Sequence, residues 1–185
     1  MLQTWSNWSG RVHCEPRDVV QPASERAIAD AVRDAAAAGR SVRVAGSGHS
    51  FTPLVATDGT LLSLDDWHGL DEIDATHCRA TIRAGSKIAS LGEPLRVHGM
   101  GLANQGDVDV QAIAGALSTG THGTGATLGS LSSQIRALRI VTASGDIAKC
   151  DAELDPDLLE AARVSLGALG VLSAATLQLV PAYRL

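Results

Sequence analysis

The sequence predicts an α+β fold with two lobes, and three observations support this expectation. The expected elements do not alternate regularly, because a βα lead-in is followed by strands, a helix and further strands, whereas a parallel α/β sheet alternates strand and helix throughout. Each half of the chain carries one glycine-rich loop with a histidine, at residues 46–50 and 115–125. Hydrophobic residues make up 45% of the 185 positions, which is sufficient for a folded core. We expect one domain over residues 1–185, with lobes at about 1–84 and 85–185.

The first part of the chain is expected to contain one helix and three strands. The helix begins after the candidate N-cap Ser24 and ends at Gly39. Its apolar residues recur at helical spacing and form one face: Ile28, Val32, Ala35 and Ala36. Alternating polar and apolar residues predict a strand at 41–45, and further strands are expected at 60–64 and 79–84.

The middle of the chain is expected to be mostly irregular, with two short helical pieces. Apolar residues at helical spacing predict a helix that ends at Gly99, and they are Ile88, Leu91 and Leu95. Glycines then punctuate residues 99–129, where one helical turn is expected near 110–117.

The last part of the chain is expected to contain a hairpin, a helix and a strand. Residues 137–142 and 147–150 flank a short turn with the sequence Ala-Ser-Gly-Asp, which is typical of a β-hairpin. Residues 157–165 have a helical pattern. Residues 172–180 have the alternation of a strand with one buried face.

Charge and cysteine content narrow the class of protein. Fifteen Lys and Arg against twenty Asp and Glu give a net charge of −5, which argues against a nucleic-acid partner. No apolar run approaches the roughly 20 residues that a membrane span needs, and residues 1–6 do not have the pattern of a signal peptide. The chain has three cysteines, Cys14, Cys78 and Cys150, which are too few and too widely spaced for a disulfide framework. No spacing typical of metal ligands is present. We expect a cytoplasmic protein without a metal.

Acidic residues are absent around both glycine-rich loops. None occurs within residues 35–57 or 110–145, although each window contains two arginines. Buried structure and chance would also produce such windows. The more specific interpretation is that both loops face an anion, which nearby carboxylates would repel.

The first loop follows an expected strand and has the sequence Gly-Ser-Gly-His-Ser. A Gly-x-Gly turn at a strand end can direct successive backbone N–H groups toward one phosphate or pyrophosphate, and the hydroxyls of Ser47 and Ser50 could donate as well. The pattern is neither a dinucleotide fingerprint nor a Walker loop. A plain connection, with His49 as an exposed loop histidine, is the alternative interpretation.

The second loop is rich in small and hydroxyl residues. Twelve of the sixteen residues in 118–133 are Gly, Ser or Thr, so its backbone can closely approach a flat or extended ligand. His122 is either a ligand contact or a histidine whose ring nitrogens are satisfied within the loop.

Four separated motifs together resemble a known family. They are Trp-Ser-Asn-Trp-Ser-Gly at 5–10, the segment 43–51, the segment 114–125 and Arg-Val-Ser-Leu-Gly-Ala-Leu-Gly-Val at 163–171. In this order they resemble the FAD-binding domain of the vanillyl-alcohol-oxidase (PCMH-type) superfamily. The sugar-lactone branch is the most similar, with L-gulonolactone oxidases and dehydrogenases and, nearby, arabinonolactone and alditol oxidases. The similarity covers nearly the whole chain.

The resemblance implies that FAD lies between the two lobes. The family histidine that matches His49 is bonded to the flavin 8α-methyl, and the loop 45–50 would cradle the pyrophosphate. No cysteine occupies the second loop, so a second covalent link is not expected. Matching positions are expected to contact the cofactor: Ala45, Gly46, Ser47, Gly48, His49, Ser50, Gly106, Asp107, Ala112, Ala114, Gly115, Ala116, Leu117, Ser118, Thr119, Thr121, His122 and Val171.

The resemblance further implies oxidation of a CH–OH group in a sugar lactone or polyol, with O₂ or a cytochrome or dye as electron acceptor. Gly106 matches a position where a small residue leaves room for oxygen. Family enzymes are roughly twice as long, so the substrate base and clamp are expected outside this chain. An FAD-binding module without turnover of its own is therefore the alternative function.

Overall fold

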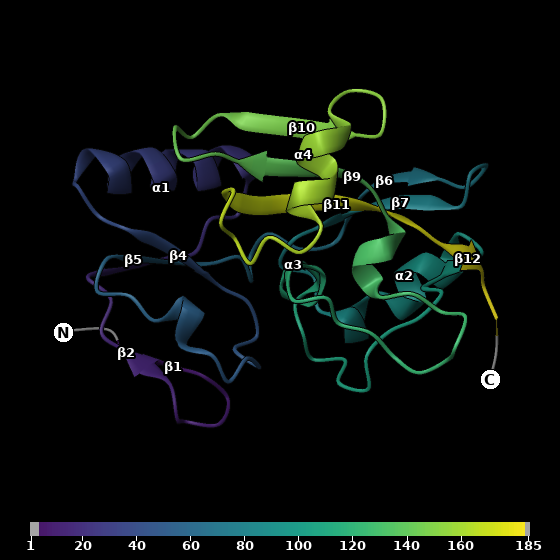
Figure 1. Ribbon diagram of the computed structural model, residues 1–185, viewed down its shortest axis with the longest axis horizontal. Coiled ribbons are helices and arrows are strands. Elements are labelled where there is room, and N and C mark those ends of the chain that lie inside the picture. Colours follow the sequence, from purple (N-terminus) through teal and green to yellow (C-terminus); the bar gives the residue numbers. More distant parts are fainter. Residues whose placement is uncertain (1–3, 184–185) are drawn as a thin grey trace.

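The computed structural model describes residues 4–183 and contains two main sheets (Figure 1). The smaller sheet has three parallel strands in the order β3-β5-β4: β3 (Asp18–Val20), β4 (Val42–Ala45) and β5 (Thr60–Ser63). Helix α1 (Glu25–Ala37) connects β3 to β4, which lie on opposite sides of β5, and supplies the crossover that parallel strands require. This sheet and α1 lie at the left of Figure 1.

The larger sheet is antiparallel and has five strands in the order β10-β9-β11-β7-β6 (Figure 1). These strands are β6 (Leu70–Asp74), β7 (Arg79–Arg83), β9 (Ile135–Val141), β10 (Ile147–Asp151) and β11 (Val171–Gln178). The mixture of a parallel and an antiparallel sheet confirms the predicted α+β class.

Shorter elements surround the two sheets. Four strands of two residues form two small pairs: β1 (Trp5–Ser6) with β2 (His13–Cys14), and β8 (Met100–Gly101) with β12 (Val180–Pro181). Short helices complete the fold: α2 (Gly92–Val97), α3 (Ile113–Ser118), α4 (Pro156–Ala162) and the 3₁₀ turns η1 (Pro53–Val55), η2 (Ile88–Ser90) and η3 (Leu131–Gln134). Within residues 4–183, no helix combines the length and apolar character that crossing a membrane requires.

Helix α1 forms where its end signals and apolar spacing predict it. The Ser24 side chain accepts a hydrogen bond of 3.1 Å from the backbone N–H of Ala27, which caps the N-terminus. Gly39 has a φ of +64° just beyond the helix, a conformation that glycine adopts without a steric penalty. Ile28 and Val32 are buried against the sheets, as the predicted apolar face requires.

The two sheets share a hydrophobic cluster. Ile28 of α1 and Leu62 of β5 pack in one cluster with Ala84, Val141 and Val171, which belong to strands of the larger sheet or follow them directly. These side chains are at most 5% exposed. A second, larger cluster lies on the five-stranded sheet beneath α2, α3 and α4. Burial of apolar surface in the shared cluster therefore holds the two parts of the molecule together.

The division between the sheets falls earlier than the expected boundary near residue 84. Strands β6 and β7 belong to the larger sheet, because β7 pairs with β11 along residues 79–83. The change of sheet therefore lies between the end of β5 and the start of β6. Local sequence could not locate this change of sheet, because β11, which joins β7 to the rest of the larger sheet, lies about 95 residues further along the chain.

A cluster of charged side chains also joins the two parts. Arg139 of β9 lies 3.0 Å from the carboxylate of Glu25 in α1 and donates a hydrogen bond of 2.6 Å to Asp71 in β6. Arg83 donates to the same Asp71 carboxylate and lies over the ring of Trp67. Arg139, Glu25 and Asp71 are only about one-fifth exposed, so these ion pairs are less screened than surface pairs.

This cluster predicts a loss of stability in acid. Partial burial raises the pKa of Asp71, but hydrogen bonds from Arg139 and Arg83 outweigh it and hold the pKa below its ordinary value of 3.8. A carboxylate with a lowered pKa stabilises the fold above that ordinary value, and the contribution is lost as pH falls through the folded-state pKa. We expect the free energy of unfolding to decrease below about pH 4, and to decrease less steeply in Asp71→Asn.

Urea unfolding at a series of pH values between 3 and 6 measures this effect. Glu93→Gln is the matched control, because Glu93 also has a lowered pKa but forms an exposed pair with Arg96. Such pairs contribute little to stability. Equal acid dependence of wild type and Asp71→Asn would contradict the assignment.

Candidate functional site

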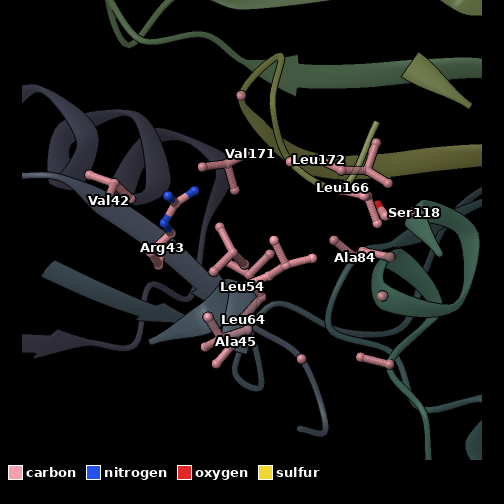
Figure 2. A pocket seen from close by; sticks show the side chains of 18 of the residues that line it. Val42, Arg43, Ala45, Leu54, Leu64, Ala84, Ser118, Leu166, Val171 and Leu172 are labelled. Atoms are coloured by element: carbon pink, nitrogen blue, oxygen red, sulfur yellow. The ribbon is translucent and has the colours of Figure 1, made fainter. Parts of the chain in front are cut away.

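A cavity of about 620 Å³ lies where the two sheets meet. Figure 2 shows that side chains from both parts surround it, with Val42 and Ala45 of β4 on one side and Val171 and Leu172 of β11 on another. Ser118, at the end of α3, lines a third side. This volume lies within the range of small-molecule and cofactor sites, and a largely apolar lining is typical of them.

The first glycine-rich loop forms one edge of this cavity. It follows β4 directly, and Gly46, Ser47, Gly48, His49 and Ser50 all line the space. Within residues 4–183, the backbone N–H groups of 47–50 donate to no protein acceptor. Unpaired donors along one turn beside a cavity are suited to an anionic group, as predicted for this loop.

The Ser47 side chain has a different position from the one expected. Its hydroxyl donates a hydrogen bond of 2.5 Å to the carbonyl of Val110 and accepts one of 3.0 Å from Lys87. Lys87 in turn forms an ion pair of 2.7 Å with Asp65. The Ser47 hydroxyl therefore ties the loop to the segment before α3, while its backbone N–H is left for the cavity.

His49 lies on the cavity edge beneath an aromatic ring. The indole of Trp8 stacks on its imidazole, with 5.2 Å between the ring centres and 10° between the ring planes. Trp8 also contacts Phe51 edge-on. Among the described residues, neither ring nitrogen of His49 has a hydrogen-bond partner, so the imidazole is held by its face and both nitrogens are available.

The second glycine-rich segment reaches the cavity only in part. Ala112, Ala114, Gly115, Ser118 and Thr119 line it, together with Val171 from β11. A Cβ built on Gly46 would lie 3.4 Å from the Cβ of Ala112, so the two loops approach each other closely. The expected cofactor positions 116 and 117 are instead fully buried in the core under the larger sheet.

Four other expected positions lie away from the cavity lining. His122 is exposed, and its Nδ1 is 2.9 Å from the carbonyl of Gly123, so this one ring nitrogen has a partner within the loop. Gly106 is buried against Thr121, whose methyl group would lie 2.8 Å from an added Cβ. Thr121 is the third of these positions, and the fourth is Asp107, which is exposed. The structure therefore separates these residues from those that surround the cavity.

A third glycine-containing segment contributes more to the site than expected. Residues 165–172 all line the cavity, although only Val171 was predicted to do so. Leu166, Gly167 and Gly170 have positive φ values, and a Cβ on Gly170 would lie 2.4 Å from the carbonyl of Val141. The two glycines of this segment were the sequence signal for a close backbone approach.

The chain is similar to several known proteins. Residues 16–151 match the family described as the FAD binding domain. The chain is 44% identical to L-gulono-1,4-lactone dehydrogenase of Mycobacterium tuberculosis (strain ATCC 25618 / H37Rv), over all of this chain and 42% of that protein. It is 35% identical to D-arabinono-1,4-lactone oxidase of Eremothecium gossypii, over 98% of this chain and 35% of that protein. It is also 34% identical to L-gulonolactone oxidase of Bos taurus, over 98% of this chain and 41% of that protein.

The fold and cavity thus define a cofactor-binding α+β domain with a cavity where its two sheets meet. The chain belongs to the FAD-binding domain family, and FAD is its cofactor. The residues fit this group, because free backbone N–H groups at 47–50 suit its diphosphate and the apolar walls suit its rings. The chain spans less than half the length of the relatives named above.

Proposed function

We propose that this chain is the FAD-binding part of an oxidoreductase that acts on the CH–OH group of a sugar lactone or polyol similar to L-gulonolactone. The observation that carries the proposal is the 44% identity to a relative named L-gulono-1,4-lactone dehydrogenase, which extends over the whole chain and includes the cavity. Bound FAD would supply a ring that accepts a hydride. The protein residues would bind and orient it.

The loop after β4 would hold the cofactor in two ways. The backbone N–H groups of residues 47–50 would bind the diphosphate, and a ring nitrogen of His49 would replace one hydrogen of the flavin 8α-methyl. The two electrons and two protons released in this substitution would reduce the flavin ring, which the electron acceptor of the enzyme would then reoxidise. The free ring nitrogens of His49 and its position on the cavity edge support this attachment. The nitrogen that forms the bond must carry a free lone pair, which requires a neutral imidazole.

A binding module without turnover is the second candidate function. Among the described residues that line the cavity, the one carboxylate is Asp65, and it is paired with Lys87 at 2.7 Å. Because the Lys87 ammonium occupies this carboxylate, Asp65 is not placed to accept a proton from a substrate hydroxyl. This observation favours a division in which the present residues bind FAD and other residues bind and deprotonate the substrate.

We also propose an electron acceptor and a cellular location. We propose O₂ or a cytochrome or dye as the electron acceptor, since the relatives carry the names of a dehydrogenase and of oxidases. A role for Gly106 as an oxygen gate stays a prediction, and in the structure the neighbour of this glycine is Thr121. A cytoplasmic location is supported by the three free cysteines.

An assay with L-gulonolactone and an artificial dye distinguishes the two functions. The protein is first saturated with FAD, and occupancy is measured from its visible absorbance. Reduction of the dye that depends on the lactone is expected if this chain catalyses the reaction. A fully occupied protein that does not reduce the dye would support the binding module instead. Protein that shows no flavin absorbance after FAD has been added and the unbound cofactor removed would contradict both.

A further inference from the structure

The N-terminal hairpin of β1 and β2 binds three consecutive carbonyl groups of the loop that follows β4. The backbone N–H of Trp8 donates to the carbonyl of Gly48 at 3.1 Å, and its indole Nε1–H donates to the carbonyl of His49 at 3.2 Å. The side-chain amide of Asn7 donates to the carbonyl of Ser50 at 3.0 Å. Two adjacent residues of the hairpin therefore donate hydrogen bonds to all three carbonyls of residues 48–50.

These three bonds determine where the N–H groups of the same peptides point. In a planar trans peptide, the C=O and N–H bonds point in opposite directions. When the carbonyls of residues 48–50 face the hairpin, the N–H groups of residues 49–51 must face away from it. Those N–H groups have no acceptor among the described residues, and His49 and Ser50 line the cavity.

Asn7 and Trp8 both contact the turn through their side chains. Asn7 is only 3% exposed, and its Oδ1 accepts hydrogen bonds from Val12 and Ser9 within the hairpin while its Nδ2 reaches Ser50. Trp8 is 57% exposed, so burial of its ring contributes less than it would in the core. The contacts of the Trp8 ring are made with His49 and Phe51 of the turn itself.

Close packing holds the hairpin on the turn. Gly48 has a φ of +67°, and a Cβ on it would lie 3.3 Å from the ring of Trp5 and 3.5 Å from the Cα of Asn7. At Gly48, the hairpin therefore lies against the turn with the ring of Trp5 and the backbone of Asn7 in close contact. Gly48 both permits this approach and supplies the left-handed conformation that turns successive peptides.

We infer that Asn7 and Trp8 are positioning residues for diphosphate binding. By engaging the carbonyls of residues 48–50, they hold the N–H groups of the turn toward the cavity before the cofactor arrives. The inference rests on the proposed placement of the diphosphate at this turn. Neither residue needs to touch the diphosphate itself, and their effect is transmitted by the orientation of the peptides between them and the ligand.

Trp8→Phe tests the inference, because it removes the indole N–H and keeps an aromatic ring. Binding of ADP, which has the diphosphate but no flavin, is measured by calorimetry. Binding of FAD is measured in the same way in the His49→Ala background, with and without Trp8→Phe, because no covalent bond to the flavin can form there. Loss of one hydrogen bond that orients the turn is expected to weaken both ligands by about threefold to tenfold. Amide NMR shifts of residues 47–50 on addition of ADP are expected to be large in the wild type and smaller in the variant.

Trp67→Phe is the matched control. The indole N–H of Trp67 also donates to a backbone carbonyl, that of Ser173 at 2.9 Å, but Trp67 is outside the cavity lining. Its replacement is expected to lower the melting temperature of the cofactor-free protein and to leave ADP affinity unchanged. Should Trp8→Phe fail to fold, 3-benzothienylalanine at position 8 keeps the two-ring shape without the N–H.

The outcomes separate this inference from the proposed function. Unchanged affinities in the Trp8 variants, with ADP-induced shifts present at residues 47–50 in the wild type, overturn the positioning role alone. Weaker FAD binding with unchanged ADP binding overturns it too, because the indole would then act on the flavin end. Absence of ADP-induced shifts at residues 47–50 in the wild type overturns both the inference and the placement of the diphosphate. The dye assay tests the reaction independently.

Discussion

Replacing His49 with alanine is expected to release all flavin from the denatured protein. A covalent bond survives unfolding, whereas the contacts of the cavity do not, so the wild type loaded with FAD should give a yellow acid precipitate. The precipitate of His49→Ala should be colourless, and its mass should be that of the chain alone. The physical reason is that His49 is the ring on the cavity edge whose two nitrogens have no hydrogen-bond partner among the described residues.

His122→Ala is the matched control for this experiment. His122 also lies in a glycine-rich loop, but it is exposed, it contacts its own loop, and it does not line the cavity. Its variant is expected to keep the yellow colour of the precipitate. A colourless wild-type precipitate would reject covalent attachment, and a yellow precipitate from His49→Ala would place the bond on another residue.

Replacing Gly85 with alanine is expected to cause the largest loss of stability. An added Cβ would lie 1.7 Å from the carbonyl oxygen of Leu64 and 2.9 Å from that of Trp67. Both neighbours are backbone atoms, and the N–H of Gly85 donates to Trp67 at 3.0 Å, so the chain cannot move aside without losing this bond. We expect a destabilisation of about 3 kcal/mol or more, as for severe overpacking of a core.

Chemical denaturation of the cofactor-free protein measures this change. Because Gly85 also lines the cavity, FAD binding should be lost in whatever fraction of the variant remains folded. Gly92→Ala is the control, since no atom lies within 4 Å of its added Cβ. Its free energy of unfolding should change by no more than about 1 kcal/mol. An unfolding midpoint of Gly85→Ala equal to that of the wild type would show that the backbone relaxes freely there.

The sequence allowed the regular elements with local signals to be predicted. The cap at Ser24 and the glycine after the helix located α1, and the Ala-Ser-Gly-Asp turn located the β9–β10 hairpin. Strand β4 and its loop were found from alternation followed by glycine. By contrast, β1, β2 and β3 were not predicted, because strands of two or three residues carry no periodicity and exist through their partners.

The sequence predicted which loops form the candidate site, but it did not predict which of their groups face the cavity. Glycine spacing identified the loop at 46–50, whose residues line the cavity. The direction of its peptide groups depends on Asn7 and Trp8, about forty residues away in sequence, and no local pattern shows this. The same limit applies to positions 116 and 117, where helical rotation directs side chains into the core.

The cluster of Ile28, Leu62, Ala84, Val141 and Val171 has one more consequence. Its members supply both the interior that joins the sheets and, at Ala84, Val141 and Val171, part of the lining of the cavity. Cutting the chain between the sheets would expose Ile28 and Leu62 to water on one piece and Ala84, Val141 and Val171 on the other. Neither fragment would keep a usable half-site, so cofactor affinity belongs to the assembled pair and should appear only after both halves have folded together.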